Sequence, residues 1–321
     1  MDNAKNIFSQ NHISIVPENR EKGYSFYSLE NTKQMILEIV IESNLGGEQI
    51  EIAHFTDVHI NYCEEEDFND SEIAYTYQKR EWLKDAVSLR SLEKSLEVAK
   101  FCDKTVITGD ILDYLSIGAK NLAIKHIFEH DKNIVCTIGG HELKKQMQTG
   151  LPEQLPLEER YNILREFWCN DITYHSEIIK DKVILVALDN SQGKYYKEQI
   201  EKLKKDISTA KSENKIILLF QHEPIYTSNP EDCDVKPVWA KLKENYNFLK
   251  CAGNPQSDDT TKEMHDLITR NSDVIRGIFC GHLHEFFYTE IKTQTGYIPQ
   301  FVCPANPYNN QVGIVGRIII K

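Results

Sequence analysis

Aspartate and histidine recur in this sequence at the points where short apolar runs end. Five such runs, "EIAHF", "KTVIT", "NIVCTI", "KIILLF" and "IRGIFC", read as strands. Carboxylate oxygens and imidazole nitrogens together suit Zn, Mn or Fe ions. The sequence therefore predicts a metal centre assembled from five separate segments, whose polar residues are Asp57, His59, Asp110, His141, His222, His282 and His284.

The spacing within these segments indicates how ions could be held. Residues two apart in an extended segment point the same way, so Asp57 and His59 could grip one ion, and so could His282 and His284. Asp110 follows a glycine, which allows close approach, and its carboxylate could bridge two cations. Two cations about 3.5–4 Å apart can hold a hydroxide between them and clamp both oxygens of an in-line displacement. That arrangement is suited to phosphoester hydrolysis.

The order of the motifs resembles that of the calcineurin-like metallophosphoesterases. The segments "DVH", "GD", "GGHE", the histidine of "FQHEP" and "GHLH" follow the family pattern Asp-x-His, Gly-Asp, Gly-Asn-His-Asp/Glu, His and Gly-His-x-His. Each motif is short and unspecific alone, but five in order, each after an apolar run, are specific. The resemblance covers roughly residues 50 to 320.

This resemblance implies an α/β fold of two stacked mixed β-sheets flanked by helices. It also implies two divalent transition-metal ions, Mn, Fe or Zn. His141 would be the acid that assists the leaving group or steadies the phosphoryl group. Asp110 would bridge the two metals. The first metal would be held by Asp57, His59 and His284, and the second by His222 and His282.

Gly140 departs from the family pattern. The family has asparagine there, whose amide oxygen is a ligand of the second metal, and glycine offers no side chain. Three explanations stay open: the second metal binds weakly, a water or Glu142 substitutes, or the chain is a natural or engineered low-activity form. An alternative function is a binding or scaffold protein that keeps the fold with a damaged site, as retromer-type relatives do. We favour the enzyme because six of the seven expected metal-binding side chains remain, together with His141.

The rest of the chain predicts elements that would position this site. Strands alternate with helices, which favours one layered α/β domain over residues 1–321, and sites in such sheets lie beyond the carboxyl ends of the strands. Residues 1–50 predict strands. Residues 227–259 form a long irregular stretch between two metal motifs and predict a site-covering insertion. Tyr226 just before it, and Trp239 and Tyr246 within it, could stack on a substrate or pack. Helices are expected over 74–102, 119–131, 158–168, 196–214 and 260–274, the last capped by Thr260 or Thr261.

The composition and charge of the chain limit the kinds of partner that we expect it to bind. Hydrophobic residues make up 40% and charged residues 27% of the 321, and the formal net charge is −12. The acidic balance argues against long nucleic acids but not against a small phosphoester, because a metal reverses the local field. The N-terminus lacks a basic and apolar leader, apolar runs are too short to span a bilayer, and the eight cysteines are scattered singly. We therefore expect a cytoplasmic protein without a membrane partner.

Several polar residues have simpler structural explanations. His54 lies within a strand, and we expect it to be a buried structural residue. Asp113 is expected to support the Asp110 loop or a helix start, and Asp189 to support the site or cap a turn. No G-x-S-x-G or phosphate-cradling glycine loop is present. The remaining histidines lie in no matching motif and are expected to be structural: His12, His126, His130, His175 and His265.

Overall fold

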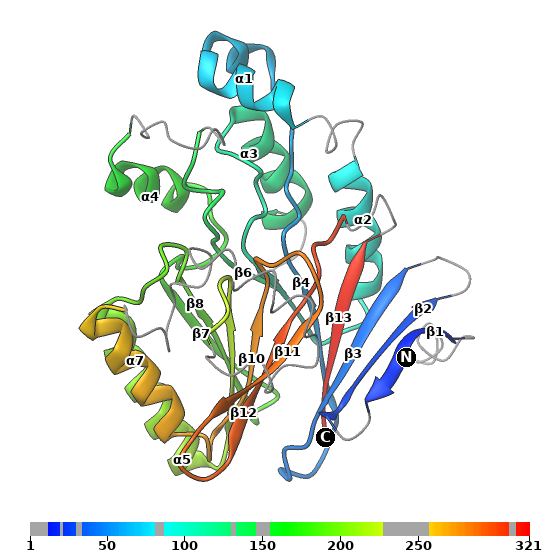
Figure 1. Cartoon of the computed structure of the whole chain (residues 1–321), viewed down its shortest axis with the longest axis vertical. Coiled ribbons are helices and arrows are strands. Elements are labelled where there is room, and N and C mark those ends of the chain that lie inside the picture. The colour runs from blue at the N-terminus through cyan, green and yellow to red at the C-terminus, as the bar shows by residue number, and fades with distance from the viewer. Residues whose placement is uncertain are drawn as a thin grey trace.

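The computed structural model describes most of the chain, and Figure 1 shows two β-sheets that face each other with helices outside them. No described helix combines the length and hydropathy that a membrane-spanning segment needs. The described residues are 12–19, 22–29, 34–80, 87–129, 133–145, 155–226, 257–307 and 313–321.

The first sheet has seven strands in the order β1-β2-β3-β13-β4-β5-β6. Strands β4, β5 and β6 run parallel, so their carboxyl ends lie at one edge of the sheet. β13 lies between β3 and β4, parallel to the former and antiparallel to the latter. The bounds are β1 His12–Asn19, β2 Tyr24–Leu29, β3 Met35–Ile41, β4 Ile50–Phe55, β5 Lys104–Thr108, β6 Ile134–Thr137 and β13 Ile314–Ile320.

The second sheet has six strands in the order β11-β12-β10-β9-β8-β7. Its four inner strands are parallel, and β7 and β11 pair antiparallel at the two edges. The bounds are β7 Tyr174–Ile179, β8 Val183–Leu188, β9 Ile216–Gln221, β10 Ile275–Cys280, β11 Phe287–Lys292 and β12 Tyr297–Val302.

Two kinds of apolar layer hold the sheets in place. Because side chains alternate along a strand, β4 sends Ile52 into the core between the sheets and Phe55 into the core beneath the helices. Leu218 of β9 and Phe279 of β10 complete the inner core from the other sheet. The outer faces are covered by α2 Val87–Ala99, α3 Ile117–Ala123, α4 Leu157–Arg165, α5 Lys197–Glu213 and α7 Asp259–Arg270, with a π-helical turn at Ile124–Phe128. α1 Ser71–Lys79 and a 3-10 turn at Glu65–Asn69 lie beyond the ends of the strands (Figure 1).

This architecture confirms the predicted fold class, and three local expectations need correction. The single helix expected over 74–102 is two helices, α1 and α2, with residues 81–86 outside the described part of the chain. The cap of α7 is Asp258, whose carboxylate accepts a hydrogen bond from the backbone N–H of Thr261 (2.7 Å), rather than Thr260 or Thr261. β11 was not expected at all. The predicted insertion over 227–259 falls largely outside the described residues, since 227–256 are not among them.

Candidate metal centre

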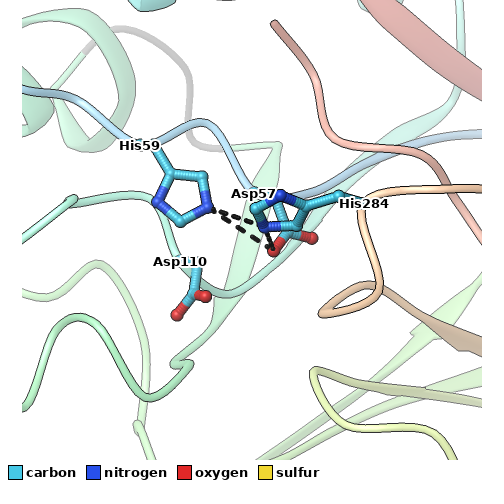
Figure 2. A group of neighbouring side chains, drawn as sticks. All are labelled: Asp57, His59, Asp110 and His284. Carbon is cyan, nitrogen blue, oxygen red and sulfur yellow. Dashed lines mark hydrogen bonds and ion pairs between the residues drawn. The ribbon is translucent and has the colours of Figure 1, made fainter. Parts of the chain in front are cut away.

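The first group of predicted ligands converges on one point. Asp57, His59, Asp110 and His284 each offer a ligand atom, and these atoms all lie within 4.8 Å of one another. Nε2 of His59 lies 3.0 Å from Nε2 of His284, which lies 3.1 Å from Oδ1 of Asp57. Figure 2 shows the rings of His59 and His284 and the carboxylate of Asp57 turned toward one another, with Asp110 beside them.

The second group shares Asp110 with the first. Ligand atoms of Asp110, His222 and His282 also lie within 4.8 Å of one another. Nε2 of His222 is 3.2 Å from Oδ2 of Asp110 and 3.3 Å from Nδ1 of His282. Asp110 is thus the one carboxylate between two clusters. The structure brings together all six residues expected to bind metal, and their role as ligands stays a prediction.

The chemistry of these donors fits cations. The buried Oδ1 of Asp57 accepts no hydrogen bond from the described residues. Nδ1 of His59 is bonded to Oδ1 of Asp113 (3.0 Å), and Nδ1 of His222 donates to the carbonyl of Thr108 (2.7 Å). Each bond leaves Nε2 of that ring facing the cluster, which is how outer partners orient metal-binding histidines.

The buried charges favour a positive centre. Burial opposes the charged form of Asp57, yet His284, His59 and His222 hold its pKa well below the usual range. Burial also lowers the pKa of His59, but the carboxylates of Asp113 and Asp57 outweigh it and raise that pKa to about 10. The pKa of His222 likewise rises to about 10, because Asp110 outweighs burial. The buried carboxylates thus favour positive charge on the histidine rings of this site.

His141 lies at the side of the clusters. Its backbone N–H donates to Oδ1 of Asp110 (3.0 Å), and its Nδ1 lies 2.7 Å from the carbonyl oxygen of Asp113. Nε2 is 3.9 Å from Oδ2 of Asp110. The side chain is 17% exposed, whereas that of His59 is fully buried. The ring is therefore fixed by its Nδ1 side and presents Nε2 at the accessible edge of the site, as the predicted acid would require.

The backbone of the site is strained. Five of the six predicted metal ligands have φ between +50° and +73°, a region that L-residues rarely adopt. Such strain persists only where the surroundings enforce it, and it concentrates at functional sites. The five residues are Asp57, His59, Asp110, His282 and His284.

Two glycines are required by close packing. A Cβ at Gly139 would overlap the carboxylate of Asp110, and a Cβ at Gly281 would overlap Thr56 and Asp57. Gly140 is different: its φ is not positive, and among the described residues a Cβ there would meet only Ser191 O at 3.8 Å and Lys144 Nζ at 3.9 Å. The backbone at position 140 can therefore carry an asparagine side chain without strain.

Glu142 does not take the place of the missing asparagine. Its carboxylate accepts hydrogen bonds from the backbone N–H groups of Gly139 (2.7 Å), Asp110 (3.1 Å) and Leu112 (2.9 Å). Burial, together with the charge of Asp110, raises its pKa to about 7. Glu142 therefore ties the β5 and β6 loops together. It follows His141 in the family motif, and that position was the available signal for it.

Asp113 and Arg80 form a support that the sequence indicated only in part. Both carboxylate oxygens of Asp113 accept from Arg80, at 2.6 and 2.7 Å. The same carboxylate orients His59 and lies 3.2 Å from Nδ1 of His141. Asp113 therefore supports the histidines, beyond the loop role expected for it. Arg80 lies in no recognisable motif, so its contact with Asp113 could not be predicted from the sequence.

The histidine placed inside a strand is structural, as expected. Nε2 of His54 lies 2.8 Å from Oγ1 of Thr108, and burial lowers its pKa to about 3. His126, His175 and His265 belong to none of the ligand clusters among the described residues. His12 and His130 have no described side chains.

Comparison with models of protein families shows to which family the chain belongs. The model of the calcineurin-like phosphoesterases matches residues 50–286. The chain belongs to the calcineurin-like phosphoesterase family. This membership confirms the resemblance seen in the motifs.

Solved structures of other phosphatases resemble this calcineurin-like chain distantly. A purple acid phosphatase from yellow lupin (Lupinus luteus) seeds is 11% identical with a TM-score of 0.43, over 92% of this chain and 48% of the lupin chain. The chain thus spans about half the length of that enzyme. A dimetal phosphatase from Danio rerio is 13% identical with a TM-score of 0.41, over 80% of this chain and 87% of the other. No curated protein matches the chain.

Proposed function

We propose that this chain hydrolyses a small phosphomonoester or phosphodiester at a two-metal centre. The observation that carries the proposal is the shared position of Asp110 between two clusters of ligand atoms, each within 4.8 Å. Divalent cations at such a centre activate water as the nucleophile and neutralise phosphoryl oxygens. Asp57, His59 and His284 would hold the first cation, His222 and His282 the second, and Asp110 both.

Residues around the metal ligands would orient the histidine rings and supply the proton for the leaving group. Asp113 fixes the rings of His59 and His141. His141 would give a proton from Nε2 to the leaving oxygen, since its Nδ1 is engaged with the carbonyl of Asp113. Glu142 holds the backbone that carries Asp110. Gly140 would make the second cation weakly bound and the enzyme slow at low metal concentration.

The partners and location form part of the proposal. The net charge of −12 supports a small substrate over a long nucleic acid. The singly scattered cysteines support a cytoplasmic location, and the six that the structure describes are free thiols.

Metal content and turnover together test this function. Purified protein would be analysed for Mn, Fe and Zn, then assayed with nitrophenyl phosphate and bis-nitrophenyl phosphate under added Mn²⁺ or Zn²⁺. Metal-dependent turnover that Asp110→Asn abolishes is expected. Bound metal without hydrolysis of any mono- or diester would instead favour the scaffold alternative.

A further inference from the structure

Lys144 lies over the bare backbone of Gly140. A Cβ built on Gly140 would be 3.9 Å from Nζ of Lys144, and the other neighbour within 4 Å among the described residues would be the carbonyl oxygen of Ser191. The side chain that the family pattern expects at position 140 would begin at this point. The ammonium of Lys144 therefore occupies the surroundings of the missing metal ligand.

The backbone of Lys144 is held in the loop that carries His141. Its N–H donates to the carbonyl of His141 (3.1 Å), and its own carbonyl accepts from the N–H of Leu115 (2.7 Å). The side chain is half-buried. Because both backbone groups are bonded, the lysine is tied to the same turn as His141, and its placement near Gly140 follows from the fold of that loop.

Within the described part of the chain, Lys144 has no close carboxylate to neutralise its charge. Among the described residues, no carboxylate oxygen lies within 4.0 Å of its Nζ. The neighbouring Lys145 differs, since its Nζ forms an ion pair with Asp70 at 3.2 Å. Lys145 is therefore held in a surface ion pair, whereas Lys144 can bind an anion.

The ammonium lies on the His222 side of the centre. A Cβ at Gly140 would also be 3.8 Å from the carbonyl oxygen of Ser191. The preceding residue, Asn190, donates to the carbonyl of Glu223 (2.7 Å) and accepts from its N–H (3.0 Å), and Glu223 directly follows His222. Lys144 therefore lies toward the second ligand cluster, where a phosphoryl group would need positive charge.

We propose that Lys144 binds a phosphoryl oxygen of the substrate beside the position left open by Gly140. The inference rests on the proposed function and deepens it. An ammonium brings three donors and a full positive charge, and its hydrogen bonds to phosphate oxygens are charge-assisted. An asparagine at 140 would compete for the same space. A tightly held second cation would place positive charge beside the substrate. Lys144 thus provides part of that charge in its place.

Inorganic phosphate provides a direct binding probe. The full-length protein would be saturated with Mn²⁺ and titrated with orthophosphate by calorimetry. Replacing Lys144 by glutamine should weaken phosphate binding by about 10- to 100-fold, the usual effect of one charge-assisted hydrogen bond. Lys144→Arg keeps a cation with donors and should stay within about threefold of the unmodified protein. Lys145→Gln is the matched control and should leave the affinity unchanged.

Metal titration separates substrate binding from metal ligation. Lys144→Gln should bind Mn²⁺ as tightly as the unmodified protein, or more tightly because a like charge is removed. Equal phosphate affinity in Lys144→Gln and the unmodified protein would overturn the proposal, and so would loss of a metal ion in that variant. If the metal-saturated unmodified protein binds no phosphate, the proposed function itself fails, and this inference fails with it. Thermal melting of each variant confirms that the folds are intact.

Discussion

Oδ1 of Asp113 lies 3.0 Å from Nδ1 of His59 and 2.6 Å from Nη2 of Arg80. The carboxylate is fully buried, and its charge is shared between a predicted metal ligand and a cation at the end of α1. Burial opposes its ionisation, but His141, His59 and Arg80 outweigh that cost and keep its pKa far below the usual range. Asp113 is therefore an ionised support for the first metal cluster.

Replacing Asp113 by asparagine should weaken binding of the first metal about 10- to 100-fold, the usual effect of removing an outer partner of a metal-binding histidine. The amide no longer holds His59 with full negative charge. Equilibrium dialysis with Mn²⁺ measures the loss. Asp266→Asn, which alters ion pairs with Arg270 and His265 on α7 and touches no predicted metal ligand, is the control and should bind metal normally.

Asp110→Asn should disable both metal positions, whereas Asp57→Asn should affect mainly the first. Asp110 belongs to both ligand clusters, and an amide cannot replace the charge that two cations share. Metal analysis of the two variants side by side distinguishes these outcomes. Full metal content and rate in Asp110→Asn would contradict the bridging role.

His141→Ala should lower kcat by about 10²- to 10⁴-fold while metal content stays nearly normal. The residue lies in neither of the two clusters that share Asp110, and its Nε2 faces the accessible edge. The loss should shrink for esters with good leaving groups, because a stable leaving anion needs no proton. A loss of equal size across leaving groups would point to a contact with the phosphoryl group instead of proton donation.

Gly140→Asn should tighten binding of the second metal and raise activity most at low metal concentration. The backbone accepts a side chain there, since the nearest atoms to a Cβ are 3.8 and 3.9 Å away. The unmodified protein should show one tight and one weak event on titration with Mn²⁺ or Zn²⁺. Two equally tight events before substitution would mean that another group already serves as the ligand.

Metal affinity should rise with pH across the neutral range. His59 and His222 have pKa values near 10 in the metal-free protein, so both rings carry a proton below that pH, and a cation must displace it. Each displaced proton makes the apparent affinity increase by up to about tenfold per pH unit until pH approaches 10. Calorimetry in buffers of different ionisation enthalpy counts the protons released. Affinity that is flat between about pH 6 and 8.5 would show that the rings are already neutral.

The strand-end residues could be predicted because apolar runs followed by Asp or His are local signals, and parallel strands bring such ends together. The supporting contacts could not. Arg80 reaches Asp113 from a different element, and Lys144 approaches Gly140 through a turn whose shape depends on Leu115. β11 was missed because "FFYTEIK" follows directly on the metal motif, and only its antiparallel pairing with β12 makes it a strand.

The place of β13 has a consequence for biosynthesis. This strand pairs with both β3 and β4, and β4 leads directly into Asp57. A ribosome releases β4 long before it makes β13, so the nascent chain carries an unfinished sheet edge next to the first ligands. The first ligands therefore lie beside an incomplete sheet until β13 has been synthesised, and we expect the first cluster to be fixed only once β13 has paired with β3 and β4.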